Sequence, residues 1–270
     1  EFVSTVDTAG GISIAPDVIF RQDVTIGAGD TPSNFDGNVD LDGLTMSAGR
    51  TVTFGDALAD TITLSTGAVS IATTANNGDL EFNGPVTGAQ DLTLTTNGSG
   101  QVIFAGDVTV GATAADALAI DAGGVDLAAN VDIDTSGVPD GDISLTVDGL
   151  TLAGTNTINA GAGNIRLTPR TPTLSIEYGD IDTALVTDVY YDSAWTGFIA
   201  GSYTIGDGTT PHTGDITITG VASAPYTLSV LNGGTGAIAV DGSYTSTGSL
   251  TLDSGSGGVS FDTVTVDLGA

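Results

Sequence analysis

Carboxylates are the side chains with which this chain could most readily do chemistry. It has 30 Asp and 3 Glu against 4 Arg, and it has no Lys. Glycoside hydrolysis needs two carboxyl groups held at a defined separation. Two groups of aspartates are close enough in sequence to supply such a pair: Asp132, Asp134, Asp140 and Asp142, and Asp180 with Asp182. Acids occur along the whole chain, however, so no pair stands out, and we expect no enzyme activity.

A nucleophilic triad is not expected either. The only His is His212, which lies in a turn rich in Pro and Thr, and there is no Cys. Although His is the commonest general base, a lone His in a loop is usually a solvated side chain. The absence of Cys excludes disulfides and thiolate metal sites.

Calcium is the metal that the acidic residues suit best, because it prefers oxygen ligands. The densest acidic run places such ligands at alternate positions, and it contains Asp36, Asn38, Asp40 and Asp42. From Asn38 onward it matches the first half of an EF-hand loop. The bidentate Glu of that loop is missing, because its position is occupied by Gly49. The sequence therefore requires no cofactor, and predicts at most a calcium site of another kind.

Aromatic residues gather in residues 168–214, which also contain three Pro. Pro cannot donate a hydrogen bond to a strand ladder, so we expect an irregular insertion or loop here. The alternative is a larger irregular coil, or a small hairpin packed on the solenoid, with the aromatic residues as its own core. Long excursions from a repeat often form a binding face. The predicted contact residues for a glycan or a neighbouring subunit are Tyr178, Tyr190, Tyr191, Trp195, Phe198 and Tyr203.

The net charge of −29 limits the partners of this protein. Nucleic-acid binding requires Lys and Arg to neutralise phosphates, so we expect no nucleic-acid partner. No apolar run approaches the 18 or so residues of a membrane span, so we expect no membrane insertion.

A repeat with a period of 22 to 26 residues organises the chain. Equivalent apolar residues open successive copies: Leu44, Val69, Leu92, Leu118, Ile143 and Ile165. Each copy holds about three short strands with alternating apolar residues, separated by Gly, Asn and Asp. One copy cannot bury its own apolar face, so the copies must stack. The sequence predicts an all-β fold, a parallel β-helix (β-solenoid) in which residues 1–270 form one domain. Its stacked interior should contain Phe54, Phe82, Phe104, Leu127 and Leu152.

Both ends of the chain have the same alternating pattern as the coils, without a polar cap. Solenoid ends expose unpaired strand edges unless they are capped. We therefore expect either the rest of a longer solenoid or head-to-tail stacking of copies, a contact that builds open fibres. The predicted stacking residues are Ile12, Ile14, Val18, Phe20, Val259, Phe261, Val264 and Val266.

The repeats DLTLTTNGSGQVIFAGDVTV, GGVDLAANVDIDTSG and GNIRLTP resemble the repeat region of giant bacterial exoproteins of the filamentous-haemagglutinin type. The resemblance covers nearly all of the chain except residues 168–214. It implies a secreted, right-handed β-helix at the bacterial surface and no catalytic residues. The expected function is therefore a structural segment of an extracellular fibre or adhesin. An adhesin module that binds glycan through residues 168–214 is the alternative, and a polysaccharide-active enzyme is the third interpretation.

Overall fold

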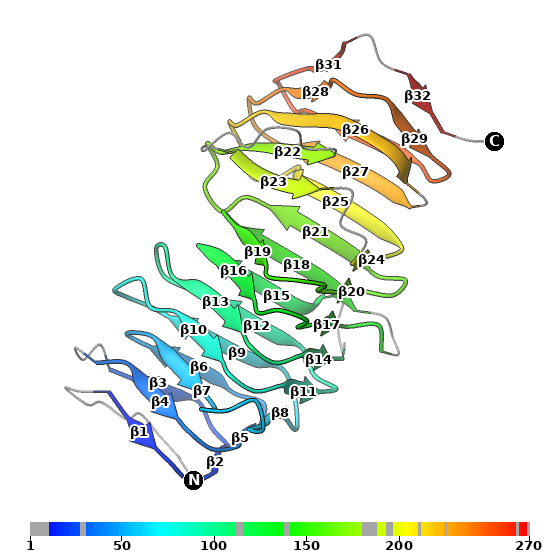
Figure 1. Ribbon diagram of the computed structural model, residues 1–270. Coiled ribbons are helices and arrows are strands. Elements are labelled where there is room, and N and C mark those ends of the chain that lie inside the picture. The colour runs from blue at the N-terminus through cyan, green and yellow to red at the C-terminus, as the bar shows by residue number, and fades with distance from the viewer. Residues whose placement is uncertain are drawn as a thin grey trace.

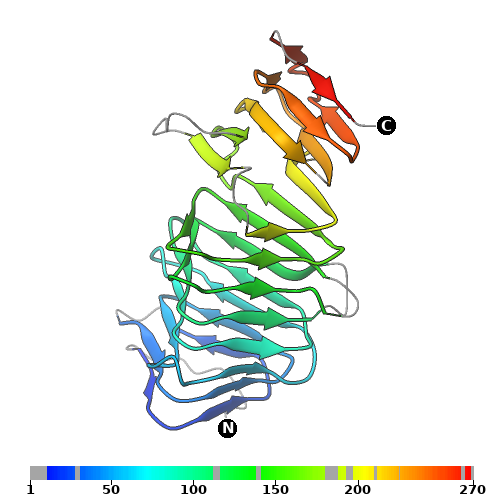
Figure 2. The same cartoon turned by 45° about the vertical axis from the view of Figure 1, so that its right-hand side comes forward.

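The computed structural model is a parallel β-solenoid (Figure 1), which confirms the fold class expected from the repeat. The structure describes residues 11–27, 31–111, 116–137, 141–179, 188–192, 197–209, 212–224, 226–262 and 265–268. These ranges contain strands and turns but no helix, and hence no helix that could span a membrane. The coils stack in chain order, so the N-terminal and C-terminal coils lie at opposite ends of the molecule (Figure 2).

Three sheets form the walls of the N-terminal coils, and the chain visits them in a fixed order. Sheet C holds β1 (Ser13–Ile14), β4 (Ser33–Phe35), β7 (Val52–Phe54), β10 (Leu80–Phe82), β13 (Gln101–Phe104), β16 (Gly124–Leu127) and β19 (Leu150–Leu152). Sheet A holds β2 (Val18–Phe20), β5 (Val39–Leu41), β8 (Ile62–Leu64), β11 (Val86–Gly88), β14 (Val108–Val110), β17 (Ile133–Asp134), β20 (Ile158–Asn159) and β24 (Phe198–Ile199).

Sheet B is the longest wall and runs through the whole stack. It holds β3 (Val24–Ile26), β6 (Thr45–Ala48), β9 (Val69–Thr73), β12 (Leu92–Thr95), β15 (Asp116–Ala122), β18 (Asp142–Val147), β21 (Asn164–Thr168), β25 (Ser202–Asp207), β27 (Thr227–Asn232) and β30 (Leu250–Asp253).

Sheet D forms the remaining wall of the C-terminal coils. Its strands are β23 (Asp188–Asp192), β22 (Ser175–Gly179), β26 (Ile216–Ala224), β28 (Ile238–Val240) and β31 (Val259–Phe261), and β26 also leads to β29 (Tyr244–Ser246) and β32 (Val266–Asp267). Sheet C ends at β19 and sheet A ends at β24, so among the described strands only sheet B continues through both groups of coils. Figure 1 shows the sideways step between the two groups at this level.

The interior is the stack of apolar residues that the repeat predicts. Phe54, Phe82 and Phe104 occupy equivalent positions on β7, β10 and β13 and are buried. Their ring centroids are 5.1 Å apart at each step, and the rings are nearly parallel, within the usual range for stacked aromatic pairs. The column continues through Leu127 and Leu152, as expected.

Corners of the coils bring backbone close to backbone, which explains the abundance of Gly. A Cβ on Gly123 would lie 2.6 Å from the carbonyl carbon of Ser99 in the preceding coil. At such a corner only Gly lets successive coils approach to the strand spacing of about 4.8 Å.

Aspartates link each coil to the next through backbone hydrogen bonds. In eight of the described aspartates, Oδ1 accepts from the N–H of a residue 21 to 25 positions later, at distances of 2.7 to 3.0 Å. The pairs are Asp17–Asn38, Asp23–Thr45, Asp79–Gln101, Asp107–Asp132, Asp132–Thr157, Asp142–Asn164, Asp148–Thr171 and Asp215–Ala237. These carboxylates therefore serve cohesion of the stack, in addition to charging its surface.

Candidate functional site

The segment 168–214 is more regular than its Pro content suggests. It contains β22, β23, β24 and β25 in full, and these strands join sheets D, A and B. The expectation of an irregular loop is therefore wrong for these strands. The departure from the repeat is local: β22 does not pair with β19 of sheet C, but pairs with β26 and β23.

Tyr178 and Tyr203 are core residues, with 4% and 5% of their surface exposed. The hydroxyl groups of Tyr178 and Tyr226 are 2.6 Å apart, and the rings of Tyr203 and Tyr226 are 4.2 Å apart. Burial raises the pKa of both Tyr178 and Tyr203. The prediction that these two residues contact a ligand at the surface is therefore wrong, because their rings fill the interior of the C-terminal coils.

The other aromatic residues of the segment have different outcomes. Phe198 is half-buried and packs against the core, so it is not a free contact residue. Tyr190 and Tyr191 lie on β23, where they pair in register with Glu177 and Tyr178 of β22. Trp195 lies outside the described residues. A contact through Tyr190, Tyr191 and Trp195 stays a prediction.

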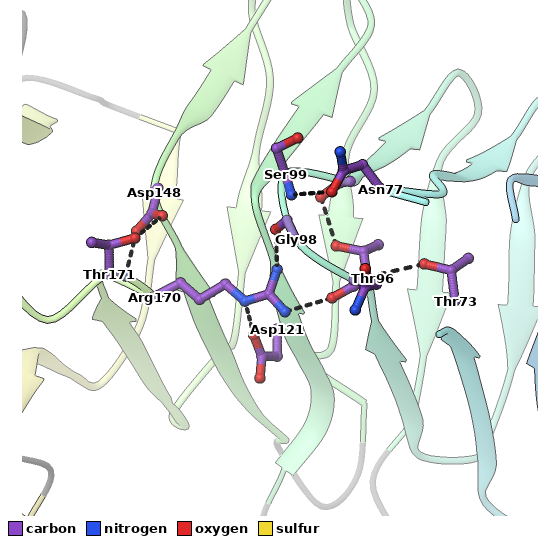
Figure 3. A network of polar contacts seen from close by, with 11 residues as sticks. Thr73, Asn77, Thr96, Gly98, Ser99, Asp121, Asp148, Arg170 and Thr171 are labelled. Carbon is purple, nitrogen blue, oxygen red and sulfur yellow. Dashed lines mark hydrogen bonds and ion pairs between the residues drawn. The ribbon is translucent and has the colours of Figure 1, made fainter. Parts of the chain in front are cut away.

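Arg170 attaches the start of the segment to the outside of the solenoid (Figure 3). Its Nη1 donates to the carbonyl of Gly98 at 2.7 Å, and its Nη2 donates to the carbonyl of Thr96 at 2.5 Å. Its Nε lies 2.8 Å from Oδ1 of Asp121. All three nitrogens of the guanidinium are thus bound, to residues of two earlier coils.

The next residue adds a second attachment. The backbone N–H and Oγ1 of Thr171 both donate to the carboxylate of Asp148, at 2.7 and 2.6 Å. Together Arg170 and Thr171 connect the corners of four successive coils, so the base of the 168–214 segment is held in a fixed position on the rod.

The acidic run lies around one strand of sheet A. Asp36 and Asn38 precede β5, Asp40 lies in its centre, and Asp42 follows it. Asn38 binds Asp17 through its side-chain amide at 3.0 Å and accepts from the N–H of Thr61 at 2.9 Å. Asp42 pairs with Arg21 at 3.2 Å and also accepts from Thr66.

Two of the four predicted calcium ligands, Asn38 and Asp42, thus already bind other groups of the protein. One oxygen of Asp40 is buried and has no hydrogen-bond partner within the described part of the chain. Within the described ranges, no group of three or more His, Asp or Glu side chains that could hold a metal ion is found. Calcium binding at Asp36, Asn38, Asp40 and Asp42 stays a prediction.

The carboxylates considered for glycoside chemistry are also partly engaged. Asp132 and Asp142 accept backbone N–H groups of the next coil, and Asp134 accepts from Ser136. Asp140, Asp180 and Asp182 lie outside the described residues.

The C-terminal end of the stack exposes apolar side chains. Phe261 and Val259 on β31 are 56% and 40% exposed, and Val266 on β32 and Leu268 are exposed as well. Val264 is not among the described residues. The three predicted stacking residues that can be placed at this end thus form one apolar surface on the last coil.

The N-terminal end differs. Val18 and Phe20 are buried, so they present backbone rather than side chains at this end, and stacking through their strand stays a prediction. Ile12 and Ile14 are only partly buried and pack against the core. Their backbone lies at or next to β1, the first strand of sheet C.

His212 also differs from expectation, since it is buried rather than solvated. Its surroundings form a pocket that the sequence did not reveal.

Comparison of the chain with protein-family models, curated proteins and solved structures finds no match. The resemblance to haemagglutinin-type repeats therefore remains an expectation, and the function rests on the geometry.

Proposed function

We propose that this chain is a structural segment of an extracellular bacterial fibre or adhesin. Stacked coils with a dry apolar interior give a rod whose backbone hydrogen bonds run along its axis. The ten strands of sheet B and the stacked Phe residues support such a role. The net charge of −29 supports it too. A highly charged exterior prevents non-specific association of rods along their sides.

One observation carries the proposal: sheet B runs through ten strands, and the outermost described coil still has interior-type side chains, Phe261 and Val259, at its edge. The equivalent positions on β28 belong to the interior, as Val240 and Ile238 are fully buried. An exposed strand edge with interior-type side chains is a surface for further strand pairing.

Two partners fit this surface: the next coil of a longer solenoid, or the N-terminal coil of a second copy. The second is the one that this chain can test. β31, β30 and β32 at one end would pair with β1, β3 and β2 at the other, which continues each wall of the stack. In that arrangement Phe261 would lie against Ile14, at the head of the column that continues into Phe35 and Phe54. Because this contact joins different surfaces, it repeats without closing and yields a filament.

Electron microscopy of the purified chain over a range of concentrations tests the proposal. We expect filaments one coil wide that become longer with concentration. The variant Phe261→Asp should remain as short rods, because it places a charge in the contact. The matched control is Leu58→Asp, since Leu58 is 67% exposed but lies on the loop between β7 and β8, at the side of the rod.

The register can be tested with single cysteines, because the chain has none of its own. Ser13 and Ser260 are exposed and adjoin Ile14 and Phe261. A mixture of Ser13→Cys and Ser260→Cys chains should be joined by a short thiol cross-linker only as filaments form. Monodisperse rods at every concentration, or equal filament formation by Phe261→Asp, would overturn head-to-tail stacking of copies and leave the longer solenoid as the partner.

A further inference from the structure

A pocket of about 330 Å³ lies on the outside of sheet B. Its floor includes residues of β15, β18, β21 and β25, and its sides include residues that follow β21 and β25. The volume is at the lower end of the roughly 300–1,000 Å³ typical of small-molecule sites. It is distant in sequence from both end coils, so it plays no part in the stacking proposed above.

Arg166 supplies the pocket with hydrogen-bond donors that are not otherwise used. It lies on β21 between Ser144 of β18 and Thr204 of β25, facing outward. Whereas Arg170 and Arg21 pair with aspartates, Arg166 makes no ion pair with any described residue. A guanidinium presents five N–H groups in a planar fork, which suits adjacent oxygens on a ligand.

His212 supplies a buried acceptor. His212 is one of the residues that line the pocket, only 4% of it is exposed, and its Nε2 has no hydrogen-bond partner among the described residues. Burial lowers the pKa of His212, against the raising effects of a hydrogen bond with the Leu174 backbone and of the Asp215 charge. The ring is therefore neutral at pH 7. A buried nitrogen without a partner is costly, and a ligand hydroxyl that donates to it would remove this cost.

The charge around the pocket selects the ligand. Asp116 and Asp207 line it together with Arg166 and Arg170, and Arg170 is already neutralised by Asp121. The lining thus offers one uncommitted positive charge beside two carboxylates, on a chain of net charge −29. An anionic ligand would be repelled. A polyhydroxyl ligand can donate to carboxylates and accept from the guanidinium at the same time.

Two further features fit a sugar ring. Asp207 is held in place because the N–H and Oγ1 of Thr209 both donate to its Oδ1 at 2.8 Å. Pro172 lines one side of the pocket and offers an apolar surface to the C–H groups of a ring. Fixed polar groups beside an apolar surface are typical of small-molecule sites.

We propose that this pocket binds one neutral sugar unit, with Arg166 donating to its oxygens and Asp116 and His212 accepting from its hydroxyl groups. The site is separate from the glycan contact expected of Tyr190, Tyr191 and Trp195.

The single His makes a direct test practical. In a ¹⁵N-labelled chain, the ring nitrogens of His212 give the only imidazole signals, and a new hydrogen bond shifts the Nε2 resonance. The probes are glucose, galactose, N-acetylglucosamine and lactose, with galacturonate as the charged comparison. We expect at least one neutral sugar to shift the Nε2 signal in a saturable manner and to bind more tightly than galacturonate.

Two arginine variants, one at Arg166 in the pocket and one at Arg50 outside it, complete the test. Arg166→Gln should weaken binding about tenfold or more, the effect of losing a charge-assisted hydrogen bond. Arg50→Gln, outside the pocket, should bind as the unaltered chain does. No shift with any neutral sugar, tighter binding of galacturonate, or unchanged binding by a folded Arg166→Gln chain would each overturn the proposal. Filament formation by Arg166→Gln should be unaffected, so failure here is distinguishable from failure of the stacking proposal.

Discussion

The backbone N–H of Thr157 donates to Oδ1 of Asp132, 2.7 Å away and one coil earlier in the stack. The N–H of Asp132 in turn donates to Asp107 of the coil before. Short acidic side chains at strand starts therefore join coils at positions where the strand ladder has not yet begun.

Removal of one such link should lower stability. Asp132→Ala leaves the Thr157 N–H without its acceptor, so we expect the free energy of unfolding to fall by about 1 kcal/mol. Asp132→Asn keeps an oxygen at the same place and should lose less. Asp126→Ala is the control, since the Asp126 side chain makes no hydrogen bond with another described residue. Urea denaturation measures all three, and equal effects of Asp132→Ala and Asp126→Ala would contradict the role of the link.

The phenylalanine column should dominate cohesion of the N-terminal coils. Phe82 is buried and stacks on Phe54 and Phe104. Phe82→Ala should cost about 3–5 kcal/mol, through lost burial and a cavity that a rigid stack cannot close. Phe82→Leu fills most of that space and should cost clearly less. Thermal unfolding followed by circular dichroism compares them, and a small loss for Phe82→Ala would mean that the coils relax around the gap.

Arg170 should control local opening of the segment that it attaches. Lys cannot reproduce a fork that binds Thr96, Gly98 and Asp121 together. In Arg170→Lys we expect faster amide hydrogen exchange in residues 171–179, with little change in sheet A. The control is Arg21→Lys, because Arg21 is half exposed and pairs across the surface with Asp42, a kind of contact worth little. Unchanged exchange in residues 171–179 would show that Thr171 and Asp148 suffice.

His212 should make stability depend on pH in a known direction. Its pKa is lowered from 6.5 in the folded chain, chiefly by burial. The unfolded chain thus binds a proton more readily, so stability from the neutral ring is present above pH 6.5 and is lost as pH falls through the folded pKa. His212→Gln should lose less stability than the unaltered chain between pH 7.5 and pH 5. Parallel losses in the two chains would argue against a buried neutral ring.

The repeat predicts the register of the coils well, because its spacing follows the positions whose side chains are buried. Equivalence of Val69, Leu92, Leu118, Ile143 and Ile165 is confirmed residue by residue. Each of these positions must be apolar to fill the interior, so the spacing of apolar residues in the sequence equals the length of each coil.

The prediction fails where a coil has an unusual length. Tyr203 pairs with Ile165, 38 residues earlier, so a period in the twenties does not align them and Tyr203 resembled a loop residue. A local signal was present, since Tyr203 and Ile205 alternate as Ile165 and Leu167 do. Tyr178 likewise alternates with Ile176 on β22.

The links between coils were missed for another reason. Asp in a turn is expected to bond its own neighbourhood, and sequence alone does not tell local from distant acceptors. The pattern of Asp directly before an apolar strand residue, as in Asp79-Leu80 and Asp107-Val108, marks most of these links. The pocket around His212 could not be found this way, because it joins residues from β15 to the turn after β25.

The end of sheet C at β19 and of sheet A at β24 has a mechanical meaning. Tension along the axis is shared by three walls in the N-terminal coils, but near β25 it passes mainly through the pairs that β25 forms with β21 and β27. We therefore expect bending and first rupture at this level. In a surface fibre with such a point in every subunit, shear would unfold the subunits one at a time. That unfolding would dissipate load that a uniform rod would transmit to its attachment.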